Sequence, residues 1–426
     1  MLIPLLSLVL AQPQPAAAAP PLDWAKLESP FLSHHTQLTF RDRYVKAGEN
    51  YFSPDGKWII FQAVEVPEKG KEPDPFYAMY VAKLEGGKLL EVTRVSPPGS
   101  ANTCGWFDPA HPGVVLFGST MVAPKDEGPS GYQRGSSKYR WAFPAEMEVV
   151  TAFSAPLWES QVGDKLKADA AAWSKANPGK APPAVQLPAL PSRTSKGVTP
   201  LFSLPNYDAE CSFDKTGRFV LYAHIEDAPK PAADAPKDAA PPKADANIYV
   251  YDTVTKKHHP IVVAPGYDGG PFFSPNNEWI CYRSDRRGND ELQLFVAKLA
   301  FTDEGGGKVP TGIDYEIQIT DNEHVSWCPY WHPSGDYMVY ATSEMGHQNY
   351  EVFAIKLDRE KIVAALRANP DQKHYTVADM PRKRITSADG ADVLPVFSPD
   401  GKKLMWTSTR DGRQPGAQLY LADFTP

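Results

Sequence analysis

One short phrase recurs along this chain: an aromatic residue, then Ser-Pro-Asp-Gly or a variant of it, then bulky apolar residues. Its copies lie at 52–56, 213–217, 273–277, 331–335 and 397–401, and a divergent copy spans 107–113. Repetition of this kind indicates a repeat architecture. Because Pro fixes its own φ and Gly tolerates a positive φ, each copy predicts a tight turn that joins two strands of a hairpin.

An aromatic residue follows each turn at a nearly constant distance, on a run with the composition of a strand. These residues are Phe61, Phe117, Tyr222, Tyr282, Tyr340 and Trp406. A third strand follows in each unit and a fourth in several, so six units of four strands predict an all-β, six-bladed β-propeller. The last unit has no fourth strand of its own. We therefore expect an N-terminal strand at about 36–40 to complete the last blade and close the ring.

The phrase, together with the later segments 292–296 and 419–421, resembles the TolB-type six-bladed β-propeller repeat family. The resemblance covers about residues 35 to 426. TolB itself has an α/β domain ahead of its propeller, whereas here a short Pro- and Ala-rich stretch precedes the first blade. The resemblance implies a propeller that binds a protein or peptide partner.

Composition and the ends of the chain suggest where the protein works. Residues 2–11 are apolar and 16–19 are alanines, which predicts an export signal at 1–19, although its start has no Lys or Arg. A linker at 20–33 and a propeller at 34–426 then follow, and we expect a monomer in the periplasm or outside the cell. The net charge of -7 argues against a nucleic-acid partner. No other apolar run approaches the ~20 residues that span a bilayer.

Three insertions interrupt the predicted propeller, at 123–140, 153–196 and 228–246. The second has a helix-forming stretch at 161–177, and the third is a Pro, Ala, Lys and Asp tract that we expect to be disordered. Loops that join second to third strands open opposite the turn phrases, on what we call the loop-rich face. This is the expected binding face. Hairpin connections need polar residues in any case, so their polarity alone does not establish binding.

The residue five positions before the aromatic of each phrase should lie where an innermost strand enters the central channel. These residues are Ala47, Asn102, Asp208, Asp268, Ser326 and Asp392. A ring of oxygens there could hold a hard cation such as Ca²⁺, or the basic group of a peptide. A solvated channel mouth would have the same composition. The predicted partner-binding set is the five polar members of this ring with Arg286, His324, His347 and Arg410.

Motifs for catalysis are missing from the sequence. It has no Gly-x-Ser-x-Gly elbow, no His-Glu-x-x-His helix and no phosphate-binding Gly loop after a strand. We therefore predict a non-enzymatic scaffold without a cofactor. The alternative is a lyase or hydrolase for a polysaccharide or peptide, with a metal or acid/base site at the channel mouth. The four cysteines fall in different blades, which predicts separate buried thiols rather than disulfides.

Overall fold

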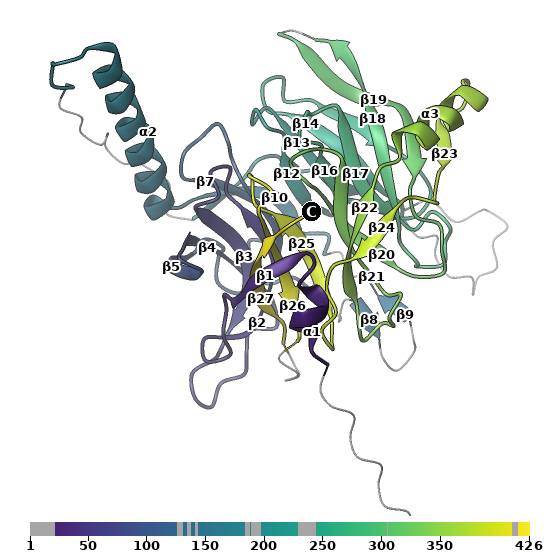
Figure 1. Ribbon diagram of the computed structural model, residues 1–426, viewed down its shortest axis with the longest axis horizontal. Coiled ribbons are helices and arrows are strands. Elements are labelled where there is room, and N and C mark those ends of the chain that lie inside the picture. Colours follow the sequence, from purple (N-terminus) through teal and green to yellow (C-terminus); the bar gives the residue numbers. More distant parts are fainter. Residues whose placement is uncertain are drawn as a thin grey trace, which may run out of the picture.

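A computed structural model of the protein describes residues 22–125, 131–133, 138–140, 144–183, 188, 197–228, 244–304, 306–410 and 416–426. Within these residues the strands form six main sheets, the blades of a six-bladed β-propeller, which are antiparallel except for one added parallel strand in the fourth blade (Figure 1). The innermost strand of each blade contacts the innermost strands of both neighbouring blades, which closes the ring. The predicted fold class is confirmed.

The first three blades follow the chain in order. Blade 1 contains β2 (Tyr44–Phe52), β3 (Trp58–Glu65), β4 (Ala78–Glu85) and β5 (Lys88–Arg94). Blade 2 contains β6 (Asn102–Phe107), β7 (Val114–Ser119), β10 (Glu148–Phe153) and β11 (Val198–Pro200). Blade 3 contains β12 (Asp208–Phe213), β13 (Phe219–Ile225), β14 (Ala246–Asp252) and β15 (His258–Val262). A separate hairpin is formed by β8 (Gly131–Gln133) and β9 (Lys138–Arg140).

The last three blades are less regular. Blade 4 contains β16 (Asp268–Phe273), β17 (Trp279–Ser284), β18 (Gln293–Asp303), β19 (Lys308–Gln318) and a fifth strand, β23 (His374–Thr376). Blade 5 contains β20 (Ser326–Trp331), β21 (Tyr337–Thr342), β22 (Glu351–Lys356) and β24 (Arg382–Arg384). Blade 6 contains β25 (Asp392–Phe397), β26 (Lys403–Ser408), β27 (Gln418–Phe424) and the N-terminal strand β1 (Leu32–Gln37). The helices are α1 (Trp24–Glu28), α2 (Ala155–Ala176) and α3 (Arg359–Ala368).

Blade 6 is completed by the N-terminus, as predicted. Strand β1 pairs antiparallel with β27, from Leu32 opposite Phe424 to Gln37 opposite Tyr420. The closing strand therefore starts and ends a few residues before the predicted 36–40. Helix α1 lies within the segment that we expected to be a linker, and its first turn is capped by Asp23, which accepts from the Lys26 amide.

Side chains inside the repeated phrase hold its turn. Ser53 Oγ donates to Asp55 at 2.5 Å and accepts from the Trp58 amide at 2.9 Å, while Gly56 takes a φ of +70°. The aromatic residues on the second strands are fully buried, including Phe61 and Trp406. Turn chemistry and a repeated buried ring therefore explain why the phrase marks each blade.

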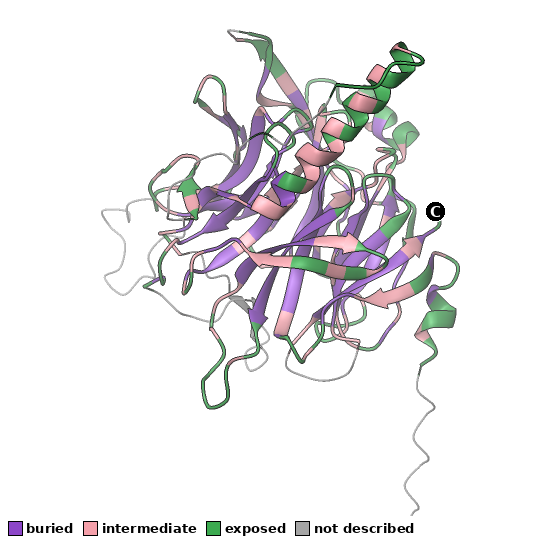
Figure 2. Ribbon diagram, turned by 90° about the vertical axis from the view of Figure 1, so that its left-hand side faces the viewer, coloured by how far each residue is buried: buried purple, intermediate pink, exposed green. Residues whose placement is uncertain are grey.

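The insertion after β10 forms a helix that begins earlier than the sequence predicts. Helix α2 starts after Ser154, whose hydroxyl accepts from the Leu157 amide, rather than at Gln161. Only its first turns touch the propeller, where Asp164 pairs with Lys57, and the rest extends away from the body (Figures 1 and 2).

Several predictions fall on residues outside the described ranges. These are the export signal at 1–19, half of the insertion at 123–140 and most of the insertion at 228–246. Of the helices described, none is both long and apolar enough to cross a membrane.

Candidate functional site

A β-bulge interrupts the innermost strand of every blade at its centre. The residue at each bulge has a left-handed backbone conformation, with φ between 42° and 58°. We call these six residues the axial ring: Glu49, Cys104, Glu210, Gly270, Cys328 and Leu394. A bulge re-aims its side chain, and only one of the six is the glycine that this conformation favours. The ring therefore carries backbone strain, which the surrounding sheet sustains.

Contacts between neighbouring blades bring the axial ring together. The Glu49 carboxylate of blade 1 accepts from the Cys104 thiol of blade 2 at 2.8 Å, and from the Cys104 amide at 3.2 Å. It also accepts from the Thr103 hydroxyl at 3.0 Å. On the opposite side, Cys328 Sγ accepts from the Leu394 amide at 3.3 Å.

Glu210 of blade 3 is held by three groups of blade 4. Its carboxylate accepts from the Tyr267 hydroxyl at 2.6 Å, the Gly270 amide at 2.5 Å and Arg283 Nη2 at 3.1 Å. A Cβ atom at Gly270 would clash with the Arg283 guanidinium. Glycine at position 270 therefore permits the left-handed backbone conformation and leaves room for the Arg283 side chain to reach Glu210.

The protonation states of the cluster follow from burial. Burial, reinforced by the charge of Glu49, raises the pKa of the Cys104 thiol well above its usual range, and burial likewise raises that of Tyr267. Burial works against the charge of Arg283, but Tyr267 and Glu210 outweigh it and raise the Arg283 pKa. A neutral thiol is a poor nucleophile. The cluster thus offers two carboxyl groups, one fixed cation and neutral donors, which suits binding rather than attack.

Four aromatic side chains fill the axis on the side of the turn phrases. Tyr51, Trp106, Phe272 and Tyr330 each come two residues after a bulge, and their ring centroids lie 5.2 to 6.4 Å apart. Three of them form the floor of a depression of about 400 Å³ among the turn phrases. Because this aromatic layer lies between the axial ring and the turns, the axial ring faces the loop-rich side.

The predicted ring of oxygens does not converge on an open channel mouth. Asp208, Asp268 and Asp392 are fully buried, and each pairs with a base at the end of the second strand of its own blade. Asp268 meets Arg286 at 3.0 Å, and Asp392 meets Arg410 at 2.8 Å. This part of the prediction is wrong because the bulge two residues later, rather than the first residue of the strand, turns a side chain toward the axis.

The pairs in blades 4 and 6 extend into four-residue chains. In blade 4, Arg286 also binds Glu316, whose carboxylate accepts from His374 Nδ1 at 2.5 Å. In blade 6, Arg410 also binds Glu28 at 3.0 Å, and Glu28 meets His35 at 2.8 Å. These chains, Asp268–Arg286–Glu316–His374 and Asp392–Arg410–Glu28–His35, hold the arginines that come two residues after β17 and β26.

The other predicted binding residues are spread over the loop-rich face. Asn102 is buried, and its amide donates to the Tyr77 carbonyl at 2.7 Å. Ser326 is also buried. His324 and His347 are exposed. Burial lowers the pKa of His347; Glu291 opposes this shift and His324 adds to it, so the two histidines lie near each other.

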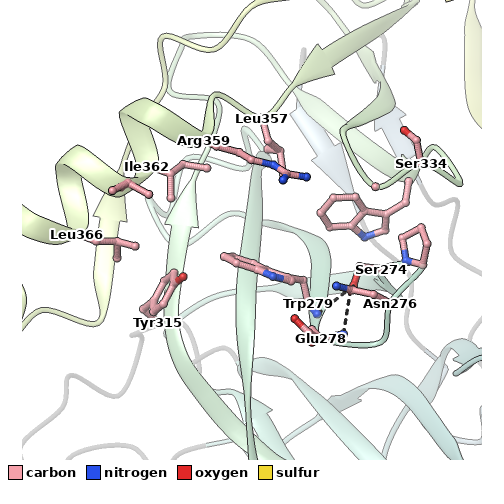
Figure 3. Close-up of a pocket in the computed structure, with 14 residues that line it drawn as sticks. Ser274, Asn276, Glu278, Trp279, Tyr315, Ser334, Leu357, Arg359, Ile362 and Leu366 are labelled. Atoms are coloured by element: carbon pink, nitrogen blue, oxygen red, sulfur yellow. Dashed lines mark hydrogen bonds between the residues drawn. The ribbon is translucent and has the colours of Figure 1, made fainter.

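A groove of about 430 Å³ lies between blades 4 and 5 on the turn side (Figure 3). Trp279 and Tyr315 line one wall, at 5.5 Å between ring centroids, and Ile362 and Leu366 of α3 line the other. Asn276 fixes the turn below by accepting from the Glu278 amide at 3.2 Å. Helix α3 covers one side of this groove beside the turns, and the sequence prediction had not included it.

Within the part of the chain that the structure describes, no group of three or more His, Cys, Asp or Glu side chains is placed to hold a metal ion. The Ca²⁺ site suggested by the sequence stays an untested prediction. All four cysteines are free and buried, as predicted.

Sequence reasoning missed the axial ring, but a usable signal for the paired bases was present. Arg286 and Arg410 each follow their Asp partner by 18 residues and each sits in a Ser-x-Arg sequence. In both, the serine hydroxyl accepts from the arginine Nε, at 2.9 and 3.1 Å. The repeated spacing could have assigned Asp268 and Asp392 to ion pairs within their blades.

No protein-family model matches the chain, and no curated protein matches it. Solved structures similar to it include a putative TolB from Agrobacterium tumefaciens, with 14% identity over 89% of this chain and 90% of that one, and a TM-score of 0.44. A protein of unknown function from Dyadobacter fermentans has 12% identity over 92% and 99%, with a TM-score of 0.49. An oligogalacturonate lyase from Vibrio parahaemolyticus has 11% identity over 91% and 93%, with a TM-score of 0.43.

Proposed function

We propose that this protein is an exported, non-enzymatic propeller that binds a protein or peptide partner on its loop-rich face. In this proposal a basic side chain of the partner reaches the axial ring. The observation that carries it is the charge of the ring: Arg283 pairs with Glu210, whereas the hydrogen bonds that Glu49 accepts among the described residues come from neutral donors. Two carboxyl groups against one fixed cation favour an incoming amine or guanidinium over an anion.

The fixed position of two arginines on the loop-rich side also supports binding. Arg286 and Arg410 are each paired with a buried carboxylate. Side chains that are already held in place lose little conformational entropy when a partner docks. Asp268 and Asp392 are already paired within their blades, so a lyase or hydrolase that depends on them has less support.

Calorimetry with short synthetic peptides tests the proposal. The probes are a pentapeptide with a central arginine and the same peptide with glutamine in its place. We expect the arginine peptide to bind at least tenfold more tightly to the wild type. A Glu49→Gln, Glu210→Gln double variant should lose this preference.

The control is Asp164→Asn, at the Lys57 pair on the turn side of the molecule. It should keep the wild-type preference. Equal binding of both peptides by the wild type, or a preference that survives in the double variant, would contradict the proposal. Thermal unfolding of each variant checks that the blades are intact.

A further inference from the structure

Lys46 is a half-buried cation on the loop-rich side of the axis. It lies on β2, the innermost strand of blade 1, three residues before Glu49 of the axial ring. Strand β2 runs from the loop-rich face toward its turn phrase at 52–56. Lys46 therefore comes before Glu49 on the way in from the loop-rich face, and both charges belong to one strand.

The Lys46 ammonium packs against an aromatic ring rather than against an acid. Its Nζ lies 4.2 Å from the centre of the Tyr77 ring. Among the residues that the structure describes, no carboxylate forms an ion pair with it. Burial accordingly lowers the pKa of Lys46. A half-buried ammonium without a counter-charge favours an incoming anion.

Tyr77 connects Lys46 with the axial ring. Its ring contacts the ammonium, and its hydroxyl is close enough to Glu49 for that charge, after burial, to raise the pKa of Tyr77. The Tyr77 carbonyl accepts from the Asn102 amide at 2.7 Å, which ties this segment to blade 2. The cation, the aromatic ring and the carboxylate thus follow one another toward the axis.

The spacing of the two charges suits a single residue of a partner. The positions of Lys46 and Glu49 are three strand residues apart, about 10 Å. An extended lysine or arginine residue covers a length of this order from its α-carboxylate to the end of its side chain, when each end forms a hydrogen bond. Arg283, the cation of the axial ring, is already held by Glu210. Lys46 is therefore better placed than Arg283 to receive a carboxylate.

The aromatic layer closes the far side of the axial ring. Its four side chains, described above, fill the axis between the ring and the turn phrases. A segment that enters from the loop-rich face meets these side chains directly beyond the ring. The path therefore has a blind end, which admits the end of a chain more readily than a chain that must enter and leave.

We propose that the partner is recognised by a C-terminal lysine or arginine, whose side chain meets Glu49 and whose terminal carboxylate meets Lys46. This role for Lys46 rests on the proposed function, because it concerns the same basic residue that reaches the axial ring. The two contacts have opposite sign. An internal basic residue has no free carboxylate, so it forms only the contact with Glu49 and binds more weakly.

Calorimetry with three pentapeptides tests the role of Lys46. The first ends in arginine with a free carboxylate, the second is its C-terminal amide, and the third ends in glutamine with a free carboxylate. We expect the wild type to bind the arginine acid about tenfold more tightly than the arginine amide. Lys46→Met removes the charge and keeps an apolar chain against Tyr77. It should lower the affinity for the arginine acid to that for the amide, and leave the affinity for the amide unchanged.

Two further variants control for charge and fold. Lys57→Met is the matched control, because Lys57 pairs with Asp164 on the turn side, and it should keep the preference for the acid. Lys46→Arg retains the positive charge and should also keep that preference. Unchanged thermal unfolding of Lys46→Met shows that a lost preference does not come from a disturbed blade.

The three peptides separate failure of this role from failure of the proposed function. Equal binding of acid and amide by the wild type, with arginine still preferred over glutamine, would overturn the role of Lys46 and leave the proposed function standing. Equal binding of the arginine and glutamine acids would overturn both. A preference for the acid that survives in Lys46→Met would assign the carboxylate to another cation, and would overturn the role of Lys46 as well.

Discussion

Blades 4 and 6 build the same Asp–Arg–Glu–His chain from different parts of the sequence. In blade 4 the glutamate, Glu316, comes from the blade's own outer strand, and the arginine is 20% exposed. In blade 6 the glutamate, Glu28, comes from the N-terminal helix, and Arg410 is only 2% exposed. The same local arrangement therefore fixes one loop in blade 4, whereas in blade 6 it also closes the ring.

The largest expected difference between the two blades is in the cost of removing the arginine. Arg410→Ala leaves Asp392 and Glu28 buried without their counter-charge, which should cost about 3–5 kcal/mol of unfolding free energy. Arg286→Ala should cost less, because Arg286 is partly exposed and water can reach the carboxylates it leaves. Urea unfolding at pH 7 measures both. Equal losses would mean that ring closure adds nothing to the blade 6 chain.

A second test concerns the pH dependence of blade 4. Burial raises the pKa of Asp268 from 3.8 to about 6, against the opposing charge of Arg286. The stability that its proton contributes is complete below about pH 4 and lost above about pH 6. Asp268→Asn should therefore flatten the stability profile between these values, by removing a fall of about 3 kcal/mol from pH 4 to pH 6.

The Asp268 effect should be seen in global unfolding. Acid titration of urea midpoints, with Asp164→Asn as a surface control, measures it. An unchanged profile in Asp268→Asn would mean that the carboxyl group is ionised throughout, as its pairing with Arg286 alone would predict.

The bulge position gives a third comparison, because it is Gly270 in blade 4 and Leu394 in blade 6. Gly270→Ala should cost about 2 kcal/mol, since the backbone has a φ of +58° and the new Cβ meets Arg283. Leu394→Gly relieves a left-handed backbone at φ +54° but loses apolar contact, so its net effect should be small. Thermal unfolding compares the stability of the two variants. A larger loss of stability in Leu394→Gly than in Gly270→Ala would contradict the assignment of backbone strain to Leu394.

These comparisons show which features a sequence can predict. The turn phrase and the buried aromatic residue after it are local and repeated, so blade number and register followed from them. The Asp268–Arg286 pair was present as a spacing of 18 residues but was not used. The bulges depend on how neighbouring strands pair, and Glu28 meets Arg410 across 382 residues, so neither has a local sequence signature.

The smallest expected difference lies at the outer end of each chain. His374 is 72% exposed where it meets Glu316, whereas His35 is 14% exposed where it meets Glu28. His35→Phe keeps an aromatic ring against Trp24 and Trp406 but removes the donor to Glu28, which should cost about 1 kcal/mol.

The matched His374→Phe variant should cost no more than about 0.5 kcal/mol, because water can replace an exposed partner. Chemical unfolding at pH 7 resolves a difference of this size when both variants share the wild-type denaturant dependence. If the two substitutions cost the same, burial at the N-terminal segment does not strengthen the hydrogen bond to Glu28. The greater stability of blade 6 closure would then rest on Arg410 and on the pairing of β1 with β27 alone.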